Sequence, residues 1–185
     1  MEGIRQGGLE LTYKICIFGD PGVGKTTLVT RYLTNEFHEQ IQATLGASIH
    51  VKYLELENGI ITLQIWDFGG HRRFRFMISS YAKASSGGIF MFDLTNYESL
   101  IALNEWLPEF GKSVRYVPLI MVGSKLDLEE QRVCKKDDVL DMMKSYNFYK
   151  YIECSSKTGE NVENVFKDLV SKILEDKGYK YIKFK

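Results

Sequence analysis

A glycine-rich segment that ends in a lysine and a hydroxyl residue carries the clearest chemistry in the sequence. Residues 19–26 fit the pattern G-x-x-x-x-G-K-[ST], between a strand-like and a helix-like segment. The glycines let consecutive backbone N–H groups converge on phosphate oxygens, and the following helix adds its positive dipole end. We therefore expect Lys25 to reach the terminal phosphates and the Thr26 hydroxyl to bind Mg²⁺. The other loop residues expected to contact the phosphates are Pro21, Gly22, Val23, Gly24 and Thr27.

Asp67 and Gly70 belong to a second candidate binding segment, one hairpin farther along the chain. The segment from Asp67 to Gly70 fits D-x-x-G and follows an apolar, strand-like run. A carboxylate at a strand end beside a phosphate loop can hold a metal-bound water, and Gly70 lets a backbone N–H approach the last phosphate. Alone, this pattern is as often a turn as a site. Its position after the phosphate loop favours the site.

Ser124, Lys125 and Asp127 follow another buried run and suit the recognition of a purine base. The Asp127 carboxylate can accept two hydrogen bonds from guanine N1–H and the exocyclic amine, and adenine would leave that charge unpaired. The alkyl stem of Lys125 can lie flat on the ring. Taken alone, these residues also suit a solvated turn. The next strand ends in a segment that can offer a backbone N–H to guanine O6 and a second lysine to the ring: Ser155, Ser156 and Lys157.

These candidates all follow strand-like runs in an alternating pattern of strands and helices. This alternation predicts an α/β fold with about six strands, mostly parallel, and about five helices. Glu57-Asn58-Gly59 contains Asn-Gly and predicts one hairpin, hence one antiparallel edge strand. Ligands in such sheets bind beyond the carboxyl ends of the strands, where the candidate loops lie. The expected strands are residues 11–18, 48–56, 60–66, 87–94, 117–122 and 149–154, and the expected helices 25–34, 97–110, 137–146 and 162–174.

The composition excludes several other classes of protein. The 185 residues include 24 Lys+Arg and 24 Asp+Glu, so the net charge is zero and no nucleic-acid partner is expected. With 44% hydrophobic and 26% charged residues, the chain is typical of a globular protein. The three cysteines form no C-x-x-C pair, which favours a reducing, cytoplasmic compartment.

A membrane anchor is also not expected in this chain. The longest apolar run, residues 87–94, is too short to span a bilayer and contains Asp93. Neither end carries a myristoylation or prenylation site. The basic, aromatic tail at residues 175–185 should adsorb only weakly to anionic lipid. A peripheral membrane location is expected only if the natural tail is longer.

Together, these segments resemble the Ras superfamily of small GTPases over residues 12–174. The resemblance is strongest to the Rab branch, while the Gly69-Gly70 pair is closer to the Arf branch. The Rab-like segments are residues 35–37, 44–46, 66–75, 79–81 and 92–95.

The resemblance implies a P-loop NTPase G domain over residues 1–185, with a core at 12–174. Phe37 would stack edgewise on the base, and Thr44 would give Mg²⁺ its hydroxyl and the γ-phosphate its backbone N–H. Residues 35–48 would form switch I, and residues 67–81 switch II. A monomer would alternate between GTP and GDP, with slow hydrolysis and a role in signalling and vesicle trafficking. Effectors, exchange factors and GTPase-activating proteins would bind through both switches.

Several residues depart from the family pattern. Ser124 stands in place of the usual Asn, Ile41 in place of an aromatic residue, and Arg72 in place of a glutamate. Pro21 removes an N–H and adds bulk where a partner's arginine would pass. His71 replaces the glutamine that orients the attacking water.

Two functions therefore stay open. One is a working GTPase, with Lys25, Thr44, Gly70 and His71 as its catalytic residues. The other is a hydrolysis-deficient GTP-binding scaffold. A small-molecule kinase or ATPase fits the phosphate loop but not Asp127. The apolar residues expected in switch II either pack in the core or form a partner surface: Phe74, Phe76, Met77 and Ile78.

Overall fold

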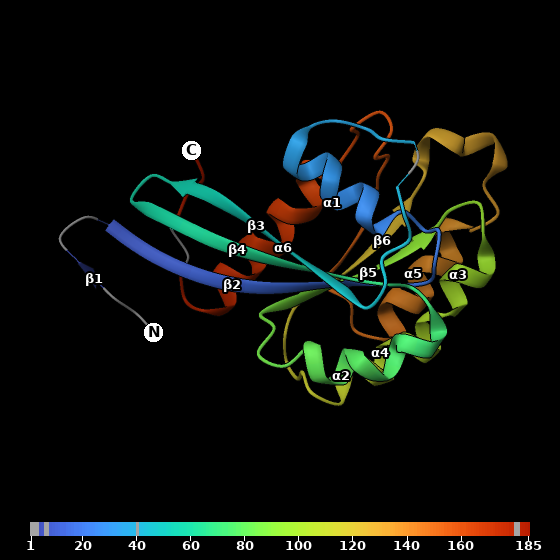
Figure 1. Ribbon diagram of the computed structural model, residues 1–185, viewed down its shortest axis with the longest axis horizontal. Coiled ribbons are helices and arrows are strands. Elements are labelled where there is room, and N and C mark those ends of the chain that lie inside the picture. The colour runs from blue at the N-terminus through green and yellow to red at the C-terminus, as the bar shows by residue number, and fades with distance from the viewer. Residues whose placement is uncertain (1–3, 6–7, 40, 180–181) are drawn as a thin grey trace.

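A twisted sheet runs through the centre of the computed structural model, which describes residues 4–5, 8–39, 41–179 and 182–185 (Figure 1). Within these residues seven strands form one sheet, in the order β3-β4-β2-β5-β6-β7, and β1 pairs with β2. The β3–β4 and β1–β2 pairs are antiparallel and the others parallel. The strands are β1 (Ile4–Arg5), β2 (Gly8–Phe18), β3 (Ala47–Leu56), β4 (Gly59–Phe68), β5 (Gly87–Asp93), β6 (Leu119–Ser124) and β7 (Lys150–Glu153).

Helices cover both faces of this sheet (Figure 1). Residues of α1 and α6, such as Leu28 and Phe166, pack with one face of the sheet. Residues of α2 to α5, such as Trp106 and Val139, pack with the other. The helices are α1 (Lys25–Thr34), α2 (Ile78–Tyr81), α3 (Tyr97–Ile101), α4 (Leu103–Gly111), α5 (Lys136–Ser145) and α6 (Val162–Asp176), and 3-10 helices lie at Arg72–Met77 and Leu126–Gln131.

The predicted fold class is confirmed, including the hairpin between β3 and β4. Several details differ from the sequence prediction, among them the helix α2, which was not expected, and the strand β2, which begins at Gly8 and not at residue 11. The two-residue strand β1 was not expected. The single helix expected at residues 97–110 is interrupted at Ala102, whose ψ of −16° tightens the turn toward 3-10 geometry. The strand expected at residues 117–122 lies at Leu119–Ser124, because Pro118 has no N–H for the ladder.

The last described residues pack back onto the sheet. Phe184 forms an antiparallel bridge with Leu56, and the Glu57 N–H donates to the Lys183 carbonyl at 3.0 Å. Phe184 and Ile182 also contact the core on the α1–α6 side. The expected basic tail is therefore partly docked, although residues 180 and 181 lie outside the described part of the chain.

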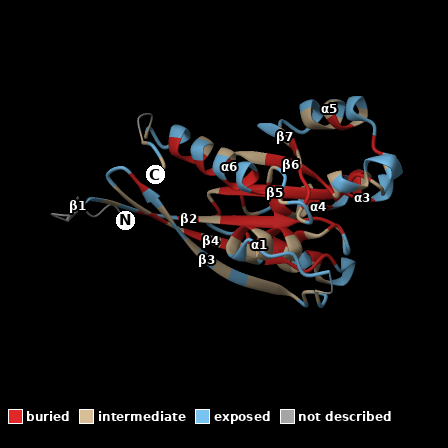
Figure 2. Cartoon of the chain, turned by 90° about the horizontal axis from the view of Figure 1, so that it is seen from above, coloured by how far each residue is buried: buried red, intermediate tan, exposed pale blue. Residues whose placement is uncertain are grey.

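Burial is greatest at the centre of the sheet, where Figure 2 shows β5 and the second half of β2 in red. Every residue of β5 is buried, whereas alternate residues of the edge strand β3 face solvent. This difference leaves the β3 side of the sheet open. Among the described residues, no helix combines the length and the apolar character needed to cross a membrane.

Candidate functional site

The glycine-rich loop connects β2 to α1, as the sequence predicted. Gly22 and Gly24 have φ angles of 76° and 92°, in the left-handed region that glycine adopts without strain. At Gly19 a Cβ atom would overlap the carbonyl oxygen of Met91, so the loop passes tightly against β5. The path of this loop therefore requires glycine at positions 19, 22 and 24.

Lys25 lies inside this loop. Its ammonium group donates to the carbonyls of Gly19 at 2.9 Å and Asp20 at 2.8 Å, and the residue is only 6% exposed. Burial lowers the pKa of Lys25 to about 8, although the charges of Asp67 and Asp20 oppose this change. An anionic ligand in the loop would favour the charged form of this lysine.

Three oxygen-bearing side chains converge beside the loop. Thr26 donates from Oγ1 to Asp67 Oδ2 at 2.5 Å and lies 2.8 Å from Thr44 Oγ1, and Thr44 Oγ1 donates to the same Asp67 oxygen at 3.4 Å. Burial raises the pKa of the Asp67 carboxyl, while the Thr26 hydrogen bond opposes this change. Asp67 Oδ1 is buried without a hydrogen-bond partner among the described residues. Hydroxyl and carboxylate oxygens fit the ligand preference of Mg²⁺.

The backbone of the D-x-x-G segment joins switch I to the phosphate loop. The Gly69 N–H donates to the Gly46 carbonyl at 2.8 Å, which holds the two switches together. A Cβ on Gly70 would overlap the backbone of Pro21 and Asp20. Gly70 is therefore one point where the backbone of switch II packs against the phosphate loop.

Asp127 and Ser155 meet on the other side of the loop. The Ser155 hydroxyl donates to Asp127 Oδ1 at 2.6 Å and accepts a hydrogen bond from the Thr158 N–H at 3.1 Å. The backbone joins the same loops, because the Leu126 N–H donates to the Cys154 carbonyl at 3.1 Å. This pairing places the predicted carboxylate in a fixed position at the cavity edge.

The unusual Ser124 ties the base side to the phosphate loop. Its hydroxyl lies within donating distance of two carbonyls, Val23 at 2.7 Å and Phe92 at 2.8 Å, and the residue is buried. The neighbouring Lys125 forms an ion pair with Asp93 at 2.6 Å. The short side chain of Ser124 is therefore long enough to connect the end of β6 to the phosphate loop and to β5.

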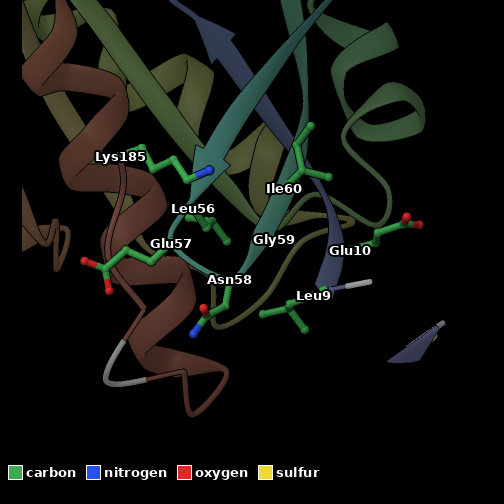
Figure 3. A pocket seen from close by; sticks show the side chains of 9 residues that line it. Leu9, Glu10, Leu56, Glu57, Asn58, Gly59, Ile60 and Lys185 are labelled. Carbon is green, nitrogen blue, oxygen red and sulfur yellow. The ribbon is translucent and has the colours of Figure 1, made fainter. Parts of the chain in front are cut away.

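Two hollows bring the remaining predicted residues together. One of about 440 Å³ is lined by base-side residues such as Asp127 and Ser156. The other, of about 280 Å³, is lined by phosphate-side residues such as Lys25 and Thr44. Both include Gly22, Gly24, Thr27 and Glu39, so they meet at the loop. A hollow of about 480 Å³ at the β3–β4 turn contains none of the predicted site residues (Figure 3).

The candidates from the two switches and the last base-side loop also line these hollows. Phe37 and Lys157 line the base-side hollow. His71 and Ile41 line the phosphate-side hollow, with His71 exposed and its ring 6.5 Å from that of Phe74.

The apolar residues of switch II were expected either to pack in the core or to form a partner surface, and they differ in burial. Ile78 is buried in the core, whereas Phe76 is 70% exposed. Phe74 and Met77 are half-buried.

The sequence interpretation missed several residues around the site. His38, Glu39, Met91 and Leu128 also line the base-side hollow. Asp20 was overlooked although it is an acidic residue inside a phosphate loop, which is a signal in itself. For the other four, the sequence pattern gives no signal.

Comparison with known proteins agrees with this arrangement. The family model described as "Ras: Ras family" matches residues 14–175. The chain belongs to the Ras family. Ras-related protein Rab-7b of Bos taurus is 39% identical over 173 residues, which cover 87% of this chain and 82% of that protein. Ras-related protein Rab-1 of Theileria parva is 36% identical over 171 residues, which cover 91% and 77%.

A plant relative gives the same result. Ras-related protein RABC1 of Arabidopsis thaliana is 36% identical over 166 residues, covering 88% of this chain and 77% of that protein. The predicted resemblance to Rab-like small GTPases is confirmed. This Ras-family protein is a small GTPase of the guanine-nucleotide-binding, P-loop class.

Proposed function

We propose that this Ras-family protein binds GTP and GDP with Mg²⁺ and hydrolyses GTP slowly as a molecular switch. The observation that carries the proposal is the pair of hollows that meet at the phosphate loop, with Asp127 on one and Thr26 and Thr44 on the other. A guanine nucleotide needs a carboxylate for its base and oxygen ligands for its metal ion at the two ends of one site.

Selection of the base depends on Asp127. Its carboxylate would accept hydrogen bonds from guanine N1–H and the exocyclic amine, while the Ser155 hydroxyl holds the carboxylate in place at 2.6 Å. Lys125 and Lys157 would cover the ring faces, and Phe37 would meet the ring edge. A backbone N–H of the Ser155–Ser156 segment would donate a hydrogen bond to guanine O6.

The phosphate-side hollow would bind the phosphates and the metal ion. Lys25 would leave the carbonyls of the loop and bind the terminal phosphates. Thr26, Thr44 and Asp67 would hold Mg²⁺, directly or through water. When bound, the ion would neutralise phosphate charge that develops during hydrolysis.

Slow hydrolysis is proposed because His71 replaces a flexible glutamine. A neutral imidazole has one donor and one acceptor, but its nitrogens point apart from a rigid ring. The exposed position of His71 supports a weak role in orienting water. We expect an intrinsic rate at or below about 10⁻⁴ s⁻¹. The alternative, a GTP-binding scaffold without turnover, draws support from the same exposure.

Partners are proposed to bind through the switches in the GTP state. Exposed apolar residues lie on β3 between the switches, including Ile49 at 55% and Tyr53 at 65% exposure, and Phe76 adds a third in switch II. Such residues suit an effector surface. We propose a monomer in the cytoplasm with these contacts, and a role in vesicle trafficking.

The testing experiment has two measurements on the purified chain. Nucleotide released by denaturation should be GDP or GTP and not an adenine nucleotide. Single-turnover phosphate release from bound GTP should then be slow but measurable with Mg²⁺. Bound adenine nucleotide would overturn the switch, and GTP that stays intact would favour the scaffold.

A further inference from the structure

A partly buried charge network joins the phosphate loop, switch II and α4. The Asp20 carboxylate accepts from Trp106 Nε1–H at 2.7 Å and from Arg75 Nη2 at 3.0 Å, both at Oδ1. Arg75 Nη1 pairs with Glu105 on the same helix as Trp106. The Arg75 guanidinium also lies over the Trp106 ring, with 4.5 Å from Cζ to the ring centroid. Three elements distant in sequence therefore meet at one guanidinium.

Three of the four side chains in this network are shielded from solvent, and Glu105 lies at its exposed edge. The side chains of Arg75 and Asp20 are 10% and 16% exposed, and Trp106 is fully buried. Removal of one partner of a buried ion pair strongly destabilises the folded protein, because the other charge is left buried without compensation. Arg75 differs from its neighbours Arg72 and Arg73 in the same 3-10 helix, which face solvent.

The network lies next to the groups that face the terminal phosphate. Asp20 directly precedes Pro21, and Gly70 packs against the backbone of both residues. Arg75 lies five residues after Gly70 and four after His71, and its side chain reaches back to Asp20 in the phosphate loop. Fixing Arg75 to Asp20 therefore limits where the segment between Gly70 and Arg75 can lie.

We propose that Asp20, Arg75, Glu105 and Trp106 form a latch that holds switch II against the phosphate loop. Arg75 is then a positioning residue, which acts on Gly70 and His71 without touching the nucleotide. This inference rests on the proposed GTPase function for its rate effect, but the latch itself can be observed without turnover.

The first test observes the latch directly through the indole N–H signals of the two tryptophans. Trp106 Nε1–H donates to a carboxylate, whereas Trp66 Nε1 is buried without a partner among the described residues. In ¹H–¹⁵N spectra, assigned with Trp66→Phe, we expect the Trp106 signal downfield of the Trp66 signal. Arg75→Ala should shift the Trp106 signal and leave the Trp66 signal in place. Unchanged signals in Arg75→Ala would overturn the latch, whether or not the protein hydrolyses GTP.

The second test measures function in matched variants. Arg75→Ala should slow single-turnover GTP hydrolysis about tenfold, because a small misplacement of Gly70, whose backbone N–H would face the γ-phosphate, costs much of the rate. It should also speed amide hydrogen exchange across residues 70–77, while GDP affinity changes less than about twofold. Arg72→Ala removes an exposed arginine from the same helix and should match the native protein in all three measurements.

Two further variants keep the test decisive if Arg75→Ala does not fold. Trp106→Phe keeps an aromatic ring under the guanidinium but removes the Nε1–H, and Arg75→Lys keeps the charge but loses the planar fork. Both should slow hydrolysis by less than Arg75→Ala and leave GDP affinity unchanged. Native rates and native exchange in both variants would overturn the positioning role. If the native protein shows no hydrolysis, the proposed turnover fails, and the indole signals and exchange still decide the latch.

Discussion

The two halves of the candidate site are organised differently. On the base side, Asp127 bonds to Ser155, and Ser124 at the end of β6 bonds to carbonyls of β5 and of the phosphate loop. On the phosphate side, Thr26, Thr44 and Asp67 bond mainly to one another. The described part of switch I between residues 36 and 46 has no helix or strand.

This difference indicates which half is built to move. The base side is fixed by hydrogen bonds between neighbouring loops and strand ends, which we expect to persist whatever nucleotide is bound. The phosphate side depends on contacts between Thr44 and groups that a metal ion and a γ-phosphate would share. Loss of those ligands should therefore release the switches while the base stays bound. The following predictions test this contrast.

Asp127→Asn should have the largest effect. An amide donates where the carboxylate accepted, so GDP should bind at least about a thousandfold more weakly, and xanthosine diphosphate should become the preferred ligand. Calorimetry with both nucleotides measures the change. Asp141→Asn, which alters an exposed carboxylate, is the control. Equal GDP affinities in Asp127→Asn and the native protein would remove the basis for guanine selection.

Thr44→Ala should affect only the GTP state. The variant loses a hydroxyl that the metal ion would use, so a non-hydrolysable GTP analogue with Mg²⁺ should bind about 10- to 100-fold more weakly. GDP affinity should stay within about twofold of the native value. Thr12→Ala, at an exposed position of β2, is the control.

Hydrogen exchange across residues 35–48 and 67–81 gives the matching structural measurement. It should differ between the GDP and GTP-analogue forms of the native protein but not of Thr44→Ala. Identical exchange in both native forms would contradict a switch and favour a static scaffold.

His71→Gln should change the rate of GTP hydrolysis and leave nucleotide affinity unchanged. His71→Gln restores a flexible donor and acceptor and should raise single-turnover hydrolysis about tenfold. His71→Ala should change the rate less than about twofold, because the native side chain is exposed. Abolition of hydrolysis in His71→Ala would instead make His71 a catalytic residue.

The smallest effect concerns Cys154, which lies behind the base-side loops. Burial raises the pKa of the Cys154 thiol to about 12, from 9.0 in an exposed thiol, and the charge of Asp127 adds to this. The folded chain therefore keeps a proton that the unfolded chain loses above about pH 9, so stability falls as pH rises. Between about pH 8 and about pH 10 this one thiol should cost about 1.4 kcal/mol of unfolding free energy.

Urea unfolding in a reducing agent at both pH values measures this cost. Cys154→Ala should lose less stability than the native protein over the same range by that amount. Cys16 and Cys134, whose thiol pKa values burial raises to about 11, contribute a similar loss to both proteins. An equal loss in the variant and the native protein would show that Cys154 is not held neutral by the fold.

Local patterns in the sequence were sufficient to predict the elements and most of the candidate site. The α1 helix lies at the predicted bounds because helix formers follow the glycine loop without interruption. The hairpin lies at Asn58 because Asn-Gly suits a tight turn between two apolar runs. Chemical groups at the ends of parallel strands must share one edge of the sheet, so Asp67 and Asp127 could be assigned to the same site.

Only the tertiary structure decided which side chains pair across the sheet. Nothing in the sequence distinguishes Arg75 from Arg72 and Arg73, yet only Arg75 turns inward to Asp20. Its orientation depends on Trp106, which is 86 residues away from Asp20 along the chain. Local propensity sets helices and turns, because those depend on neighbouring residues. Burial of a charge depends on partners that only folding brings into contact.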